Sequence, residues 1–328
     1  MSCGKMSVGG YLEGAFAAMV IVSVSSVGAQ SYPVKPIHFI VAVPPGGPAD
    51  TLSRLVGPRL TAALGQPVVI DNRAGANGNI AYEMTARAAP DGYTIASVAT
   101  GIAINPSIYR DVKFDPVKDF AAITQAIAVP NILVVHPAVA AASVQELIAL
   151  AKARAGQLVF ASAGNGTSGH LALEQFRLLS GIEVVHVPYK GGGPALTELL
   201  AGQVQALFSI ALVAIPQVKA GRIRALAITS AKRFVLVPDL PTVAESGFPG
   251  FECIGWFGVV APAKTPRNIV ELMHREITRA LRQPEIAQRL QDQGADVVAG
   301  SSAAFAAYIA AEQLKWAGVI RKAGIKQD

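Results

Sequence analysis

Hydroxyl and imidazole side chains gather in one stretch of the sequence, LVFASAGNGTSGHLALE, which spans residues 158–174. Ser162, Thr167 and Ser168 offer hydroxyl donors that suit a carboxylate, and His170 follows them closely. A serine and a histidine could also serve nucleophilic catalysis, but the base must then lie within hydrogen-bond reach of the hydroxyl. We find no G-x-S-x-G nucleophile elbow and no recognisable nucleophile–base pair. We therefore interpret His170 as a helix-face residue at a cleft or as a structural histidine, and we predict no catalytic residues.

The same stretch contains a G-x-G-x-x-G pattern at 164–169, directly after an apolar strand, as in dinucleotide-binding turns. In those turns an acidic residue ends the next strand and binds the ribose. Here that strand has Glu183 at its start and Tyr189-Lys190 at its end. We therefore predict no nucleotide cofactor. Tyr189 and Lys190 could meet a ligand, although a solvated lysine beside a turn is an equally good interpretation.

Metal and thiol chemistry have little support in the sequence. The five histidines, at positions 38, 136, 170, 186 and 274, do not cluster. Of the two cysteines, Cys3 lies in the N-terminal segment that we expect to be removed, so Cys253 would stand alone. Neither a metal site nor an intramolecular disulfide is expected.

Turns rich in glycine recur after apolar strands, and each runs into a helix. The four copies lie at 38–50, 68–79, 158–169 and 184–194. The first amides of a helix have no partner within it, and the helix dipole favours negative charge there. In the copy PPGGPAD, Gly46 and Gly47 let the backbone approach a ligand closely, although an ordinary tight turn would look the same. The pattern favours capture of a small anion over its chemical conversion.

Around these turns the sequence alternates strands and helices. The predicted strands are 38–43, 68–70, 94–98, 132–136, 158–162, 184–189, 206–210 and 223–229. The predicted helices are 50–64, 79–89, 143–154, 167–180, 194–201, 211–220, 269–282, 284–293 and 302–322. Gly57-Pro58 should kink or break the first helix. This rhythm predicts mostly parallel sheets with helices on both faces.

The two halves of the chain begin alike, each with a strand, a glycine turn and a helix. We therefore predict an α/β fold of two doubly wound lobes whose carboxyl-end loops surround one ligand cleft. The hinge candidates are Pro130-Asn131 and residues 230–242. They divide the chain into lobe one, at 30–131 plus 240–328, and lobe two, at 132–239.

The N-terminus predicts export. Residues 15–24, AFAAMVIVSV, form an apolar segment of signal-peptide length, and cleavage after Ala29 fits the residues that follow. The alternative is a buried helix of the first domain. The net charge is +6, and its basic residues are scattered, so nucleic acid binding has little support. A mild positive field would attract anionic solutes or simply aid solubility.

Many motifs in a fixed order resemble one family from about residue 32 to the C-terminus. They include YPVKPIHFIVAVPPGGPAD, LGQPVVIDNRAGANGNI, FASAGNGTSGHLALE and HVPYKGGGPALTELLAGQV. These motifs are similar to those of the Bug receptors, the periplasmic substrate-binding proteins of tripartite tricarboxylate transporter (TctC-like) systems. The resemblance implies a two-lobed, Venus-flytrap receptor of the periplasmic-binding-protein kind that closes over a small organic carboxylate.

The resemblance also implies the ligand-binding residues. The first turn of such receptors corresponds here to Pro45, Gly46, Gly47 and Ala49, the loop after YTIASVAT to Thr100, and the turn of lobe two to Ser162, Gly164, Gly166, Thr167 and His170. Tyr189 and Ser209 complete the expected set. Two positions depart from the family pattern: Pro48 removes a hydroxyl and an N–H donor, and Ser209 stands where many relatives carry Asp. Without that carboxylate an amino-acid ligand is disfavoured, so we expect a plain mono- or dicarboxylate, aromatic ones included.

The expected function is that of an exported, monomeric periplasmic receptor that delivers its carboxylate to an inner-membrane transporter. A receptor that presents the ligand to a sensor protein would have the same sequence features. An exported α/β hydrolase is the third hypothesis. Product formation would distinguish it, because a receptor returns its ligand unchanged.

Overall fold

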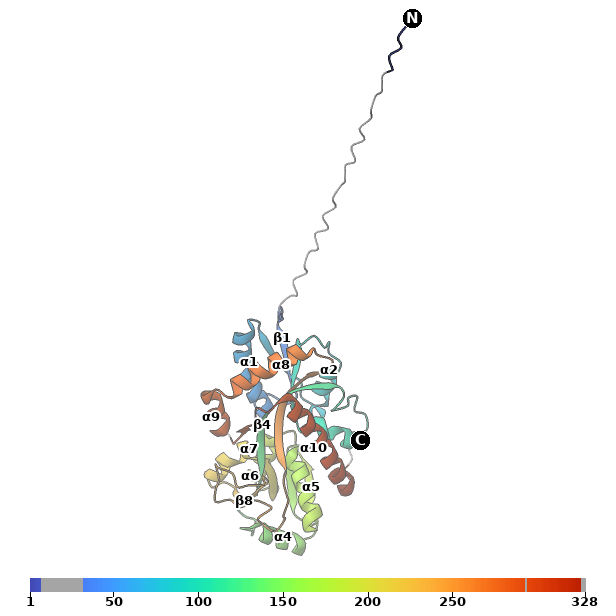
Figure 1. Ribbon diagram of the computed structural model, residues 1–328. Coiled ribbons are helices and arrows are strands. Elements are labelled where there is room, and N and C mark those ends of the chain that lie inside the picture. Colours follow the sequence, from blue (N-terminus) through green and yellow to red (C-terminus); the bar gives the residue numbers. More distant parts are fainter. Residues whose placement is uncertain (7–31, 293, 326–328) are drawn as a thin grey trace. The chain divides into compact units, whose positions relative to one another are not determined.

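The computed structural model describes residues 1–6, 32–292 and 294–325 (Figure 1). The apolar segment 15–24 of the predicted signal peptide (residues 1–29) and the cleavage after Ala29 lie outside these residues. Met1–Tyr32 and Pro33–Asp328 form separate units, and the fold described below is that of the second. Among the described residues, no helix is both long and apolar enough to cross a bilayer.

The strands of this unit join in one ten-stranded sheet with the order β2-β1-β3-β9-β4-β7-β5-β6, and β8 and β10 pair with β4 outside that path. Their bounds are β1 Ile37–Val41, β2 Val68–Asn72, β3 Thr94–Ala99, β4 Phe120–Val135, β5 Val159–Ser162, β6 Val185–Pro188, β7 Ala206–Ile210, β8 Arg224–Ile228, β9 Ile254–Pro262 and β10 Asp296–Val297.

The sheet is mixed, which corrects the prediction of mostly parallel sheets. Parallel pairing occurs where strand and helix alternate, in β1 with β2 and β3, and in β5 with β6 and β7. Strands β4 and β9 run antiparallel to each other and to their other neighbours. The 16-residue β4 pairs with β9 through Pro130 and with β7 from Asn131 onward, so a single strand serves both halves of the sheet.

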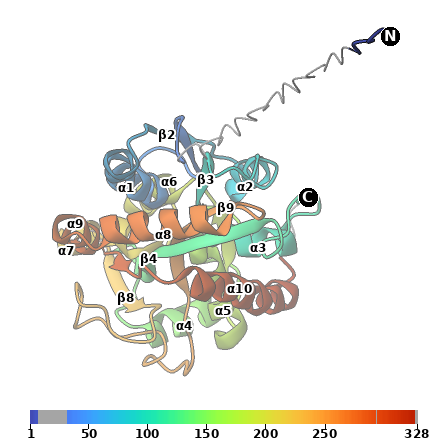
Figure 2. The ribbon, with the colours of Figure 1, turned by 45° about the horizontal axis from the view of Figure 1, so that its top comes forward.

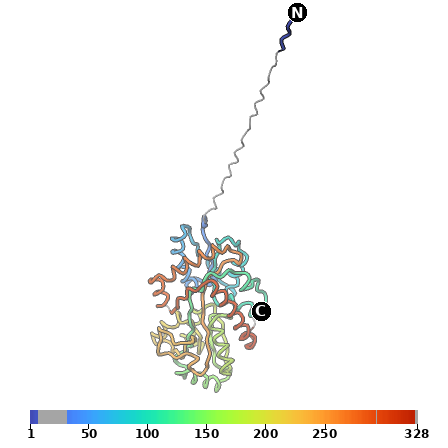
Figure 3. The backbone as a smooth tube through the Cα atoms, in the orientation of Figure 1, coloured from blue at the N-terminus to red at the C-terminus, as the bar shows by residue number. Residues whose placement is uncertain are grey.

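Ten α-helices of the described chain accompany the sheet, together with a 3₁₀ turn at Ala76–Gly78. Their bounds are α1 Pro48–Leu64, α2 Asn79–Ala86, α3 Gly101–Ile108, α4 Val144–Ala153, α5 Ser168–Ser180, α6 Gly192–Leu200, α7 Ala211–Lys219, α8 Arg267–Leu281, α9 Pro284–Asp292 and α10 Ser302–Ala323. Figure 2 shows α8 and α10 running on either side of β4, and both pack against it. Figure 3 shows the C-terminal helices lying beside the N-terminal elements, and α8 indeed packs on α1.

Of the kink or break expected at Gly57-Pro58, the break is wrong, because helix α1 continues through Pro58. Proline removes one backbone hydrogen bond. Buried side chains on both sides of it, Val56 and Leu60, anchor the helix against the sheet. Apolar burial of this kind contributes about 1.5–3 kcal/mol for each large side chain, which outweighs one lost bond.

Helix α10 joins elements from both halves of the sheet, because it packs on α3, β4 and α5. Its Glu312 is 5% exposed and accepts hydrogen bonds from the indole nitrogens of Trp256 on β9, at 3.1 Å, and of Trp316, at 2.9 Å. The two indole N–H groups therefore satisfy one buried carboxylate and tie α10 to β9.

Candidate functional site

The turn that joins β1 to α1, residues 44–50, is organised by a buried carboxylate. Asp50 is 2% exposed and accepts hydrogen bonds from the Gly46 amide, from Arg54 Nε and from Asn72 Nδ2, each at 2.9 Å. Burial opposes ionisation of Asp50, but the bonds from Arg54, Gly46 and Asn72 more than offset it and hold the pKa of this carboxyl below its usual value. Asp50 is thus ionised and holds the turn in shape.

Hydrogen bonds within the first turn already occupy some of the backbone amides that were expected to bind a ligand. The Gly46 amide is taken by Asp50, and the Gly47 amide donates to Pro44 O at 3.3 Å. The first helical bond runs from Thr51 N to Gly47 O, so the amides of Ala49 and Asp50 have no acceptor within α1. Of the predicted residues in this turn, Ala49 therefore offers the better-placed donor.

The turn that joins β5 to α5, residues 162–168, has a similar construction. The Gly164 amide donates to Ser162 Oγ at 3.2 Å, and the Gly166 amide donates to His170 Nδ1 at 3.1 Å. Thr167 caps α5, with its hydroxyl accepting from the His170 amide and donating to Gly164 O. The amides of the first two helical residues, Ser168 and Gly169, have no acceptor within the helix.

Beneath this turn two imidazole rings stack. The rings of His170 and His186 lie 4.3 Å apart and 13° from parallel, and His186 Nε2 is 2.7 Å from Ser162 Oγ. This contact corrects the sequence analysis, which found no serine–histidine pair. The two residues are 24 positions apart, and the parallel register that sets Phe160 beside His186 brings them together. A histidine within the strand after the turn was the available signal.

Both imidazoles are neutral at physiological pH. Burial lowers the pKa of His170 to about 3, assisted by His186 and Arg177, and burial and Arg177 lower that of His186 to about 4. Because His170 Nδ1 accepts a bond from Gly166, the proton of this ring sits on Nε2, which lies 3.8 Å from Glu174 Oε1. Burial raises the pKa of Glu174, although its bonds from Arg177, at 2.9 and 3.0 Å, oppose the shift.

A loop of the first half of the sheet meets the second turn at Asn77. A Cβ on Gly166 would lie 2.7 Å from Asn77 Nδ2 and 2.9 Å from Ile108 Cδ1, and Gly166 has φ +75°, so only glycine fits without displacement. Asn105 fixes the loop by accepting from Asn77 Nδ2 at 2.8 Å and by donating to Asn77 O at 3.0 Å. Residues 68–79 were predicted as a glycine turn, and neither asparagine was among the predicted site residues.

The other predicted residues lie around the same region. Thr100 precedes α3 and is 5% exposed, and its hydroxyl accepts a hydrogen bond from the Trp256 amide at 3.4 Å. The Tyr189 amide donates to Ser162 O at 2.9 Å, which joins Tyr189 to the second turn. Ser209 is buried and follows Phe208, whose carbonyl contacts Gly169 at the start of α5. In the first turn, the side chain of Asp50 makes its contacts with Arg54 and Asn72.

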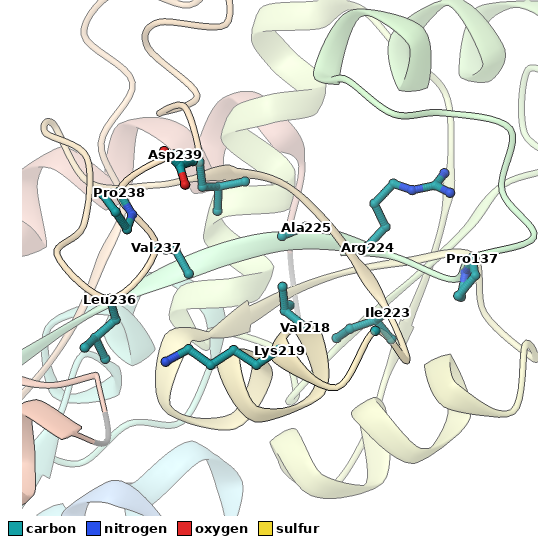
Figure 4. Close-up of a pocket in the computed structure, with 12 residues that line it drawn as sticks. Pro137, Val218, Lys219, Ile223, Arg224, Ala225, Leu236, Val237, Pro238 and Asp239 are labelled. Atoms are coloured by element: carbon teal, nitrogen blue, oxygen red, sulfur yellow. The ribbon is translucent and has the colours of Figure 1, made fainter.

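A cavity of about 620 Å³ lies elsewhere, between α7, β8 and residues 236–240 (Figure 4). Its walls are mostly aliphatic, with Lys219, Arg224 and Asp239 as charged residues, and none of the predicted ligand-binding residues lines it. Within residues 32–292 and 294–325, no group of three His, Cys, Asp or Glu side chains is placed to hold a metal ion.

Residues 52–325 match the sequence profile described as tripartite tricarboxylate transporter family receptor. Protein BugT of Bordetella pertussis is 38% identical over 302 residues, which are 92% of this chain and 93% of BugT.

Two solved structures from Rhodopseudomonas palustris are similar along most of the chain. Rpa4515 with adipate has a TM-score of 0.84 and 36% sequence identity, covering 90% of this chain and all of its own. MatC with bound malate has a TM-score of 0.81 and 31% identity, covering 88% of this chain and all of its own. The predicted fold, with the architecture of a periplasmic binding protein, is confirmed.

Proposed function

The chain belongs to the receptor family of tripartite tricarboxylate transporters, and we propose that its ligand is a small organic mono- or dicarboxylate. The ligand would lie between lobe one, residues 30–131 plus 240–328, and lobe two, residues 132–239. The observation that carries this proposal is the lining of the second turn, which combines helix N-terminal amides, hydroxyls and neutral imidazoles. The adipate and malate found in similar receptors are consistent with it.

The residues proposed to bind the ligand are Pro45, Gly46, Gly47, Ala49, Thr100, Ser162, Gly164, Gly166, Thr167, His170, Tyr189 and Ser209. Their roles differ. Ala49 contributes an amide, Ser162 and Thr100 contribute hydroxyls, and the glycines shape the turns. Gly166 and His170 bond to each other and support the second turn from below. The two buried carboxylates nearby are already compensated, Asp50 by Arg54 and Glu174 by Arg177, so neither repels an anion strongly.

The expected affinity follows from a few charge-assisted hydrogen bonds. Each contributes about 1.5–3 kcal/mol. After the costs of lobe closure and of lost ligand freedom, a net of roughly 8 kcal/mol would remain, which corresponds to micromolar binding. Closure requires contacts with both lobes, because a ligand shifts an open–closed equilibrium only through its difference in affinity for the two states.

Thermal-shift and calorimetric titrations of the chain from Gln30 onward test the ligand class. The panel contains adipate, malate, succinate, benzoate, glutamate and NAD. We expect one or more plain carboxylates to raise the melting temperature in a dose-dependent manner, with glutamate binding more weakly and NAD not at all. Mass spectrometry should recover the bound carboxylate unchanged. Stabilisation by NAD alone, or conversion of a bound ester to its acid and alcohol, would contradict the proposal.

Receptors of this family are periplasmic binding proteins. For this chain, we propose that it is exported with cleavage after Ala29. We also propose that it delivers its ligand to an inner-membrane transporter. The intact mass of the protein from a periplasmic fraction tests the cleavage. Uptake of labelled carboxylate, with and without the receptor, separates transport from presentation to a sensor, and sedimentation tests the expected monomer.

A further inference from the structure

His186 stands beside the proposed ligand-binding turn, yet the sequence analysis gave it no role. It lies on β6, its ring stacks on His170, and its Nε2 is 2.7 Å from Ser162 Oγ. Ser162 is fully buried, at 0% exposure. The contact is thus a short hydrogen bond between a fully buried serine and a partly buried histidine, where bond direction matters more than at the surface.

The direction of this bond sets what Ser162 can offer to a ligand. A hydroxyl has one proton to donate and two lone pairs that can accept. The Gly164 amide already occupies one lone pair, because a backbone N–H can only donate. If His186 Nε2 carries the ring proton, it fills the second lone pair, and the serine proton is left for a further acceptor. If Nε2 is bare, it takes the serine proton, and Ser162 can then only accept a bond from the ligand.

We propose that His186 is a positioning residue of the ligand site: with its proton on Nε2 it donates to Ser162 Oγ and directs the serine proton to the ligand carboxylate. This inference rests on the proposed function, because a carboxylate only accepts hydrogen bonds. His186 itself would not touch the ligand. The stacked ring of His170, fixed by its bond from Gly166, holds the plane of the His186 ring.

The arrangement also bears on ligand selectivity. Ser209 disfavours an amino-acid ligand because it offers no carboxylate to an ammonium group. The direction of the Ser162–His186 bond acts in the same sense, because a Ser162 that only donates favours carboxylate oxygens and leaves an ammonium group without an acceptor there. The Ser162 hydroxyl therefore selects an anion without a net positive charge beside it. The two stacked neutral imidazoles, His170 and His186, set the direction in which this hydroxyl donates.

A double-mutant cycle tests the proposal with the tightest-binding carboxylate among adipate, malate, succinate and benzoate. The variants are Ser162→Ala, His186→Phe and their combination. Removing a charge-assisted hydrogen bond should raise Kd about 10-fold or more in each single variant. If His186 acts through Ser162, the double variant should bind no more weakly than Ser162→Ala alone. Equal weakening by His186→Phe with and without the serine would overturn the proposal.

Two further variants separate positioning from loss of structure. In His186→Gln the carboxamide keeps a donor near the position of Nε2, and it should restore most of the affinity that His186→Phe loses. His136→Phe is the matched control, since His136 lies in the same half of the molecule and accepts a bond from the Ala138 amide, away from the turn. It should leave Kd unchanged.

A second measurement does not depend on how well the variants fold. ¹⁵N NMR of the histidine rings in the wild-type protein distinguishes the protonated from the bare ring nitrogen. With saturating carboxylate we expect His186 protonated on Nε2, and a proton on Nδ1 would overturn the proposal. If the wild-type protein binds no carboxylate of the panel, the proposed function has failed instead.

Discussion

At the scale of single residues, the second turn is held by groups that stay uncharged in the folded protein. His170 and His186 have pKa values lowered to about 3 and about 4, mainly by burial. In the unfolded chain an imidazole titrates near pH 6.5. Between these values the unfolded chain binds protons that the folded chain does not, so the free energy of unfolding must fall as the pH falls.

We therefore predict that His186→Gln reduces the pH dependence of stability. Below pH 6.5 each buried imidazole costs up to about 1.4 kcal/mol per pH unit. Urea unfolding between pH 6.5 and 5 should show a smaller slope for the variant than for the wild type, by up to that amount. Near pH 8 the two slopes should agree, because the imidazole is then neutral in both states. Equal slopes throughout would mean that His186 is accessible to protons in the folded chain.

At the scale of elements, the strand–turn–helix units were predictable because each carries its signals locally. Strand β5 ends at Ser162, just before the glycines, and α5 covers Ser168–Ser180, close to the predicted 167–180, with Thr167 as its N-cap and Gly181 as its C-cap. Strand β9 and the first part of β4 were missed. They pair with each other across more than a hundred residues, without a hairpin turn to mark them. Helix α3 was missed as well, because Pro106 interrupts its pattern.

The candidate site follows the same division. Glycine turns and hydroxyls could be found in the sequence because they lie within one segment. The Ser162–His186 bond depends on the register between two strands, and the contact of Asn77 with Gly166 depends on how the two halves of the sheet approach each other. Neither arrangement leaves a local pattern. The lobe boundaries were placed at Pro130-Asn131, which lies within β4, and at residues 230–242, and they stay a prediction.

A glycine substitution tests the approach of the Asn77 loop to the second turn. Gly166→Ala should suffer both from its positive φ, at roughly 1–2 kcal/mol, and from overlap with Asn77 and Ile108, at roughly 1–3 kcal/mol more. Gly156→Ala is the matched control, with φ +70° and no atom within 4 Å of the added Cβ. Denaturant unfolding should therefore show the larger loss for Gly166→Ala. Equal losses would mean that backbone strain alone matters at Gly166.

At the scale of the whole molecule, the two halves of the sheet share few elements: the long strand β4, its partner β9, and α10, which packs across them. A receptor that closes around a ligand needs such shared elements to stay intact while the halves move. The bond of Glu312 to both tryptophans is where α10 is attached to β9. Loss of that attachment should therefore affect both the stability of the whole fold and the affinity for the ligand.

Glu312→Ala should leave two buried indole N–H groups without an acceptor, at about 1–3 kcal/mol each, whereas Glu312→Gln keeps an oxygen that can accept. The chain has only two tryptophans, Trp256 and Trp316, so its tryptophan fluorescence reports on this junction. We expect Glu312→Ala to shift the emission to longer wavelength and to lower the unfolding midpoint in urea, with a smaller change for Glu312→Gln. Because α10 contacts both α3 and α5, the alanine variant should also bind carboxylate more weakly, although Glu312 lies outside the proposed binding set. Unchanged affinity in a destabilised Glu312→Ala would show that the junction stabilises the fold without taking part in closure.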